Sequence, residues 1–211
     1  MNLKNIRKNI YKEAKLTARK YGWSENLFDI LSNKSSYTCK EIYDLFPEGY
    51  LSIVQIYLEE INEKMTKESE KINLIRLKTH ERIRELCILR LNIMAKEKDL
   101  ASKTFLHLLL PFNCKFSSKN LYKTVDQIWF LAGDNSTDFN FYSKRIILAS
   151  IYTSTMIHFI NNDNMDDTLF LLNKLLRRVS KIPQIKSNIN NFTKIIPQIF
   201  KLGKKFNFVK Q

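Results

Sequence analysis

The sequence predicts an all-helical fold, and three observations support this class. The chain of 211 residues contains only four Gly and four Pro, whereas a sheet protein needs many turns that are built from these residues. Apolar residues recur at helical spacing along most of the chain. Hydrophobic residues make up 44% and charged residues 27%, as in a globular protein with a packed core.

Three short helices are predicted at the start of the chain. A stripe of apolar residues continues to Tyr21, and Gly22 ends this first helix. Ser24 is a natural N-cap for a second helix over about 25–31, and a third helix covers about 39–45. Three short helices followed by a longer one form a helix-turn-helix pattern. The spacing at its end resembles that of TetR-type regulators, through Ile42, Tyr43, Phe46 and Leu51.

Longer amphipathic helices are predicted for the rest of the chain up to residue 181. Their apolar residues recur at a spacing of three and four. Residues 113–118 are predicted to be a loop, and Ser136 or Thr137 is expected to cap the helix that follows. The predicted helices cover 50–65, 72–96, 100–110, 121–132 and 165–181, and the helix that follows the cap at Ser136 or Thr137 continues to about 160.

Three parts of the chain follow from these elements. They are a helix-turn-helix-like N-terminal unit (1–48), a larger helical domain (49–182) and a basic amphipathic C-terminal tail (183–211). Three cysteines without a CxxC spacing indicate a reducing compartment without disulfides. Cys87, between two apolar neighbours, is interpreted as a core residue.

The tail is predicted to contact an anionic membrane surface. The formal net charge is +14, and no Asp or Glu follows Asp167. The apolar residues of the tail fall near one helical face, and lysines are interleaved with them in the sequence, which is typical of a basic amphipathic helix that lies in a membrane interface. A tail that docks on its own domain, or that is disordered, stays an alternative. The predicted membrane-binding residues are Ile189, Phe192, Lys194, Ile195, Ile196, Ile199, Phe200 and Lys201.

Residues 125–145 read VDQIWFLAGDNSTDFNFYSKR. This stretch resembles the family of lipid-binding accessory proteins of ubiquinone (coenzyme Q) biosynthesis, the ninth Coq protein. Other stretches that fit the same family are Gly22-Trp23-Ser24, Leu45-Phe46-Pro47 with Gly49, Arg82-Ile83-Arg84 with Arg90-Leu91, and 149–155.

The resemblance implies a TetR-like fold that has lost DNA binding. It also implies a homodimer formed through the last two long helices, and an isoprenoid or quinone lipid that is presented to a hydroxylase of the pathway. By position, the residues that would contact the hydroxylase are Asp126, Ile128, Trp129, Phe141, Tyr142 and Arg145. Phe141 departs from the family pattern, in which Trp is usual.

The same residues also have structural interpretations. Gly133 fits a helix C-cap, and Asp134 with Ser136 and Thr137 fits a capped turn. Asp138 would stabilise a helix N-terminus. The aromatic residues between 129 and 142 are too many for one core from two helix ends, so some should be exposed at an interface.

A lipid cavity is expected in the second domain because the resemblance implies one. Its candidate wall consists of Leu89, Ile93, Phe105, Leu108, Leu109, Leu131, Ile147 and Ile151. Composition alone fits a solid packed core equally well.

No catalytic motif is found in the sequence. A phosphate loop, an HExxH pair, an ExxH pair and a serine nucleophile elbow are all missing, so a non-catalytic protein is predicted, with no cofactor beyond a bound lipid. The alternative is a ligand-responsive TetR-type repressor. Its third helix offers only Lys40 against Glu41 and Asp44, however, so specific DNA binding is not expected.

The predicted location is peripheral on the inner membrane. No apolar run approaches the length of a membrane span. Residues 1–21 are poor in Arg and Ser and are interpreted as mature protein rather than as a transit peptide. The expectation is therefore a cytoplasmic protein on the bacterial inner membrane, or a protein on the matrix side of the mitochondrial inner membrane if the source is eukaryotic.

Overall fold

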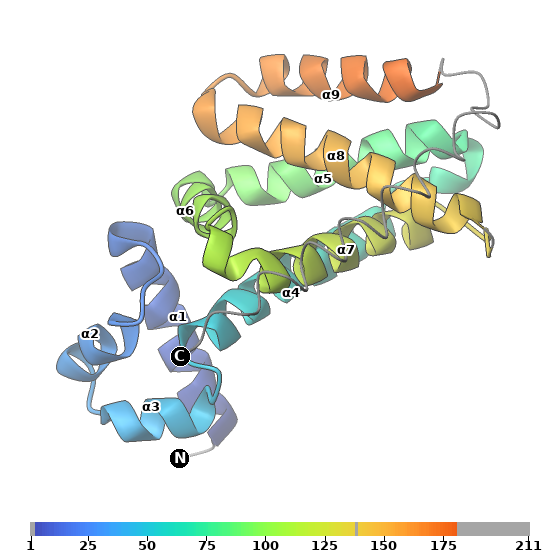
Figure 1. The fold of residues 1–211 in the computed structure, drawn as a ribbon. Coiled ribbons are helices and arrows are strands. Elements are labelled where there is room, and N and C mark those ends of the chain that lie inside the picture. Colours follow the sequence, from blue (N-terminus) through green and yellow to red (C-terminus); the bar gives the residue numbers. More distant parts are fainter. Residues whose placement is uncertain (1–2, 138, 181–211) are drawn as a thin grey trace, which may run out of the picture. The chain divides into compact units, whose positions relative to one another are not determined.

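The computed structural model describes residues 3–137 and 139–180. Within these residues every regular element is a helix (Figure 1), which confirms the predicted all-helical class. The α-helices are α1 (Leu3–Tyr21), α2 (Leu27–Lys34), α3 (Cys39–Leu45), α4 (Tyr50–Ser69), α5 (Thr79–Ala95), α6 (Lys98–Leu108), α7 (Cys114–Leu131), α8 (Phe139–Asn161) and α9 (Met165–Ser180). Two short 3-10 helices, η1 (Leu74–Arg76) and η2 (Pro111–Asn113), precede α5 and α7.

The described residues up to Leu176 belong to one compact unit, and the described residues from Arg177 onwards belong to a second. The predicted boundary after residue 48 falls between α3 and α4. The predicted boundary at residue 182 and all eight predicted membrane-binding residues of the tail lie outside the described residues. None of the described helices has both the length and the hydropathy that crossing a membrane requires.

Helices α1 to α3 form the N-terminal head, around buried Phe28, Ile42 and Phe46. Gly22 ends α1 with a φ of 84°, which only glycine adopts without strain, as the sequence predicted. The predicted Ser24 cap is wrong, because α2 begins two residues later than expected. Asn26 occupies its N-cap position without a side-chain hydrogen bond. At α3 the Thr38 hydroxyl and the Glu41 carboxylate form a reciprocal capping box.

Helices α4 to α8 pack around the main core. Helix α4 contacts α5 and α7, and α8 contacts α6 and α7. The fully buried apolar side chains in this core include Ile53, Met65, Leu86, Leu91, Leu100 and Ile128. Helix α1 packs on α6, and the buried Trp23 indole donates a hydrogen bond to Thr104 at 2.9 Å. The head is thereby joined to the wall of the cavity described below.

Two predicted segments differ in the structure. Residues 113–118 are not a loop, because α7 begins at Cys114. Residues 72–78 are not part of a long α-helix, because α5 begins at Thr79. There the Glu81 carboxylate accepts a hydrogen bond from the Lys78 backbone N–H at 2.8 Å, which caps the first turn.

Candidate functional site

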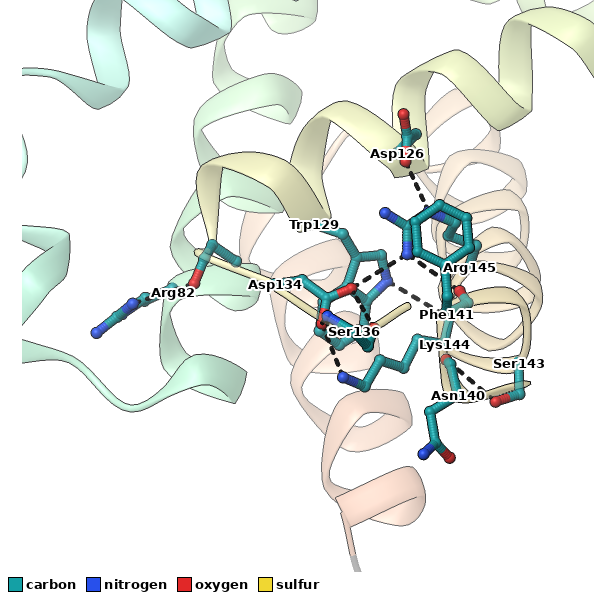
Figure 2. Close-up of polar contacts among 11 residues, drawn as sticks. Arg82, Asp126, Trp129, Asp134, Ser136, Asn140, Phe141, Ser143, Lys144 and Arg145 are labelled. Atoms are coloured by element: carbon teal, nitrogen blue, oxygen red, sulfur yellow. Dashed lines mark hydrogen bonds and ion pairs between the residues drawn. The ribbon is translucent and has the colours of Figure 1, made fainter. Parts of the chain in front are cut away.

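The corner between α7 and α8 is a tight turn that follows from the sequence AGDNS. Gly133 has a φ of 79°, and its N–H and that of Asp134 donate to the carbonyls of Phe130 and Trp129. This confirms the predicted C-cap at Gly133. Arg82 reaches the corner from α5 and donates to the Ala132 carbonyl at 3.1 Å (Figure 2).

Asp134 is the centre of this corner (Figure 2). Its side chain is only 3% exposed, and its two oxygens accept hydrogen bonds from three side chains. Lys144 donates at 2.8 Å, Arg145 at 3.1 Å, and the Ser136 hydroxyl lies 2.8 and 2.9 Å from the two oxygens. A buried carboxylate is therefore paired with two cations and fully hydrogen-bonded. Of the predicted capped turn, this confirms the roles of Asp134 and Ser136.

Arg145 extends the same network to α7. Its Nε donates to the Asp126 carboxylate at 2.6 Å, and its Nη1 donates to the Phe141 carbonyl at 3.0 Å. The guanidinium also lies 3.3 Å from the centroid of the Phe141 ring. The Trp129 indole donates to the Lys144 carbonyl at 3.2 Å. Residues 125–145 therefore join α7 to α8 through ion pairs and aromatic contacts.

The Asp134 carboxylate is expected to make the fold sensitive to acid. Burial would raise its pKa, but the hydrogen bonds from Lys144, Ser136 and Arg145 outweigh burial and lower the pKa from 3.8 to about 2. Because the pKa is lower in the folded state, the stabilisation is complete above about pH 4 and is lost as the pH falls towards 2. At about 1.4 kcal/mol per pKa unit, the loss is roughly 2 kcal/mol.

Thermal unfolding of the protein and of Asp134→Asn between about pH 5 and pH 2 measures this contribution. On acidification, the free energy of unfolding of the variant should fall by roughly 2 kcal/mol less than that of the parent. Identical pH dependence in the two proteins would mean that protonation of the Asp134 carboxylate is not coupled to unfolding.

The residues predicted to contact a hydroxylase differ in their exposure. Tyr142 is 61% exposed, Asp126, Trp129 and Phe141 are half-buried, and Ile128 and Arg145 are buried. Ile128 packs in the core, and Arg145 holds the corner through its ion pairs with Asp126 and Asp134. Phe130, which the predicted set lacks, is 71% exposed. The expected exposure of some of the aromatic residues between 129 and 142 is confirmed.

A groove of about 240 Å³ lies between α7 and α8 beside Tyr142. Three of its lining residues, Tyr122, Tyr142 and Ile146, are exposed. Its other lining residues are Ser118, Leu121, Val125, Arg145 and Ala149.

A larger cavity of about 320 Å³ lies among α4 to α8. Its wall is mostly apolar, and three of the predicted lipid residues, Phe105, Leu108 and Leu109, line it. The other five, Leu89, Ile93, Leu131, Ile147 and Ile151, do not line it. Further wall residues are Tyr57, Leu58, Ile61, Arg90, Met94, Ala101, Thr104, Leu110, Pro111, Cys114, Ser117, Ser118, Asn120, Leu121, Thr124, Tyr152, Thr153 and Met156.

One side of this cavity is open and the other is closed. Leu109, Leu110, Pro111 and Cys114 at the junction of α6, η2 and α7 are exposed and form the mouth. The floor consists of buried residues from α4, α5, α7 and α8, among them Tyr57, Arg90, Thr124, Tyr152 and Met156. The cavity is of the size and polarity that suit a small apolar ligand.

The isolated titratable residues have structural roles. Cys87 is buried, as predicted, and burial raises the pKa of its thiol to about 12. His107 is buried and pairs through Nε2 with the Asn113 amide at 3.0 Å. Nowhere in residues 3–137 and 139–180 do three or more metal-binding side chains come together.

Residues 114–185 match the COQ9 family. Ubiquinone biosynthesis protein COQ9, mitochondrial, from Bos taurus is 35% identical over 89 residues, which cover 42% of this chain and 28% of that protein. The Homo sapiens protein of the same name is 28% identical over 129 residues, covering 58% and 41%. The Xenopus tropicalis protein is 29% identical over 152 residues, covering 67% and 48%. The chain thus spans less than half the length of these relatives.

Among solved structures, the TetR transcriptional regulator from Nitrosomonas europaea has the same fold. The two superpose with a TM-score of 0.66 at 17% sequence identity, covering 83% of this chain and 98% of that one. The predicted TetR-like fold is confirmed. The predicted resemblance is also confirmed: residues 114–185, which include the corner at Asp134, match the COQ9 family, and the chain is similar to proteins of that name.

Proposed function

We propose that the protein is a non-catalytic lipid-binding protein of ubiquinone biosynthesis, which holds an isoprenoid quinone intermediate and presents it to a hydroxylase. The observation that carries the proposal is the apolar cavity of about 320 Å³ in a chain that is similar to ubiquinone biosynthesis proteins. Its volume is at the lower end for ligand sites. It suits a ring with the first isoprene units, while the rest of the chain passes through the mouth.

The direct test is to purify the protein, extract it with organic solvent and identify the bound lipids by mass spectrometry. The expected result is a stoichiometric amount of a quinone or another isoprenoid lipid. A folded protein that contains no lipid, and that takes none up from vesicles containing ubiquinone, would refute lipid binding.

The mouth of the cavity supports contact with a membrane. Phe112 is 74% exposed beside it, and Leu106, Leu109 and Leu110 are also exposed. Exposed Lys115 and Lys119 follow on α7. Apolar side chains surrounded by lysines suit an anionic bilayer surface, from which an apolar ligand could enter without crossing water. Peripheral binding to the inner membrane is part of the proposal. The names of the relatives describe them as mitochondrial, so the membrane proposed is the mitochondrial inner membrane.

Replacing Leu110 and Phe112 together by Glu should weaken binding to anionic vesicles by at least about tenfold. The variant loses two apolar side chains at the interface, each worth on the order of 1.5–3 kcal/mol when fully buried, and gains two repelling charges. Co-sedimentation with phosphatidylserine-containing vesicles measures the effect. Ile75→Glu is the matched control, because Ile75 is an exposed apolar residue that is not part of the mouth. An equal loss in the control would contradict membrane contact through the mouth.

The groove between α7 and α8 supports contact with the hydroxylase. Ser118 and Leu121 line both the groove and the cavity, so only one layer of side chains separates a docked partner from the ligand. Such a short separation favours transfer of the ligand without exposure to water. Asp126, Trp129, Phe141 and Tyr142 would make the contact, and Ile128 and Arg145 would support it from within.

Tyr142→Ala should weaken binding to the hydroxylase by roughly tenfold or more, as is usual for a central aromatic residue of an interface. Because the Tyr142 side chain is mostly exposed, the melting temperature should change little. Binding is measured by surface plasmon resonance with the purified hydroxylase. Phe130→Ala removes another exposed aromatic ring outside the groove and should leave binding intact. A lower melting temperature with unchanged binding would make Tyr142 structural.

A homodimer through α8 and α9 is also part of the proposal. Ile157 on α8 and Phe170 on α9 are large exposed apolar residues, and self-association would bury them. Sedimentation equilibrium measures the state, and a monomer at micromolar concentration would refute it.

A DNA-binding repressor remains the alternative function. In the head, Glu41 caps α3 and Asp44 is exposed on it, so two carboxylates would face the phosphates. Sequence-specific binding in a gel-shift assay would favour the repressor over the lipid-binding protein.

A further inference from the structure

Arg90 on the cavity floor is a charge in an apolar position. The buried face of α5 consists of Ile83, Leu86, Cys87, Arg90, Leu91 and Met94, so Arg90 occupies a place in the helical repeat that the other members fill with apolar groups. Its side chain is only 2% exposed. A buried cation is costly unless it is paired or fully hydrogen-bonded.

The partners of Arg90 within the described residues are all neutral. Its Nε donates to the Tyr152 hydroxyl at 2.8 Å, its Nη2 donates to the Thr124 hydroxyl at 3.3 Å, and its Nη1 donates to the Asn62 side-chain carbonyl. A guanidinium has five N–H groups, and these bonds use three of them. No carboxylate of the described residues forms an ion pair with it. Arg145, the other buried arginine, has two such partners.

The two acidic residues that affect Tyr57 on the cavity wall are already paired. Glu60 and Glu97 both bind Lys15, at 3.5 and 3.1 Å. They affect the Tyr57 hydroxyl on the cavity wall, whose pKa is raised by burial and by these two carboxylates, so it stays a neutral donor. The Tyr57 hydroxyl has no hydrogen-bond partner among the described residues. Because none of their fully buried polar side-chain atoms lacks a partner, this hydroxyl keeps some accessible surface, and Tyr57 is one of the residues that line the cavity.

We propose that the cavity binds an acidic amphiphile, whose carboxylate or phenolate head lies against Arg90 and Tyr57 on the floor while its apolar chain leads to the mouth. This inference rests on the proposed lipid-binding function and specifies the chemistry of the ligand. An oxygen anion supplies the charge that the neutral partners of Arg90 do not. It also accepts hydrogen bonds from the remaining guanidinium N–H groups, and such bonds to charged groups are stronger than neutral ones.

The proposal distinguishes acids from neutral lipids of the same chain. Equilibrium binding of tritium-labelled oleic acid and oleyl alcohol, at about pH 8 where the carboxylic acid is ionised, compares two ligands that differ only in the head group. Oleate should bind at least about tenfold more tightly, because hydrogen bonds from the guanidinium to a charged carboxylate are stronger than those to a neutral hydroxyl.

Arg90→Met should remove this preference and leave the affinity for oleyl alcohol within about twofold, since Met keeps the apolar volume of the side chain. Thr153→Val, a change elsewhere on the same wall, is the matched control and should keep the preference. If Arg90→Met does not fold, Arg90→Lys and Tyr57→Phe test the same point. Lysine keeps the charge without the planar fork, and Tyr57→Phe removes only the hydroxyl, so each should lower the preference by a few-fold.

The outcomes separate this inference from the proposed function. Equal binding of oleate and oleyl alcohol by the parent protein, or a preference that survives Arg90→Met, overturns the role of Arg90 and leaves lipid binding standing. Binding of neither lipid overturns both the acidic ligand and the cavity as a lipid site. Preferential binding of oleate that Arg90→Met abolishes is the expected result.

Discussion

Replacing Asp134 by Ala is expected to lower the free energy of unfolding by about 3–5 kcal/mol, because buried Arg145 then loses one of its two carboxylate partners and keeps only the partly exposed Asp126. The Asp134 and Arg145 side chains are 3% and 6% exposed and lie 3.1 Å apart. The variant also loses the hydrogen bonds from Ser136 and Lys144 that hold the turn. For a chain of this length the melting temperature should fall on the order of 10 °C, as measured by circular dichroism at neutral pH.

Asp163→Ala is the matched control for this measurement. Asp163 forms an ion pair with Lys98 at 2.7 Å, which is shorter than that of Asp134 with Arg145, but its side chain is fully exposed. Exposed ion pairs contribute about 0–1 kcal/mol, so the control should melt within a few degrees of the parent. If the two variants lose the same stability, burial is not what makes the Asp134 pair strong.

The same corner shows that structural and functional interpretations of one stretch are compatible. Asp134 and Ser136 are occupied with the turn itself, whereas Tyr142 and Phe130 are exposed beside it. The buried ion pairs fix the angle between α7 and α8, and this angle determines the groove in which Tyr142 lies. A partner that binds the groove would therefore depend on Asp134 without contacting it.

The class of fold and most of the helices could be predicted because apolar periodicity and the scarcity of glycine act locally. The start of α7 could not. Asn113 precedes α7 and could cap it, but its side-chain amide binds the carbonyl and the ring of His107 instead. Ser117 donates to the Leu108 carbonyl. Both polar side chains have tertiary partners, so the segment that reads as a polar loop forms a helix.

The segment before α5 illustrates the opposite error. Residues 72–78 carry apolar residues at helical spacing, yet Arg82 takes their backbone carbonyls as its acceptors. Its Nε donates to the Leu77 carbonyl at 2.9 Å and its Nη2 to the Ile75 carbonyl at 3.1 Å. This competitor for the carbonyl groups lies outside the segment, further along the chain, so it leaves no trace in the periodicity of residues 72–78 themselves.

The cavity could be placed in the right domain but not outlined. The resemblance implied a cavity and the apolar second half supplied candidate residues, of which Phe105, Leu108 and Leu109 line the cavity. Whether facing side chains meet or leave a void depends on how several helices pack, which is why Leu89, Ile93, Leu131, Ile147 and Ile151 do not line the cavity. Arg90 was missed among the cavity residues, although an arginine in phase with Leu86 and Met94 on an apolar face is a signal that the sequence does contain.

Filling the cavity is expected to remove bound lipid without unfolding the protein. Ala101 and Thr153 line the cavity from α6 and α8, and the described residues offer no side-chain hydrogen bond to the Thr153 hydroxyl that a substitution would break. In Ala101→Leu combined with Thr153→Phe, larger apolar groups occupy the space of the ligand. Lipid recovered per protein by solvent extraction and mass spectrometry should fall at least tenfold, a loss of about 1.4 kcal/mol or more in binding free energy.

The effect on stability distinguishes a cavity from a packed core. Where a void exists, added apolar atoms gain contacts and stabilise a protein by about 0.5–2 kcal/mol, whereas overpacking a solid core costs about 1–3 kcal/mol. The melting temperature of the lipid-free double variant should therefore equal or exceed that of the lipid-free parent. Thr153→Val, which removes the hydroxyl without filling space, should change neither lipid content nor melting temperature appreciably. An unchanged lipid content in a well-folded double variant would mean that the lipid binds elsewhere on the protein, and the groove beside Tyr142 would be the next site to test.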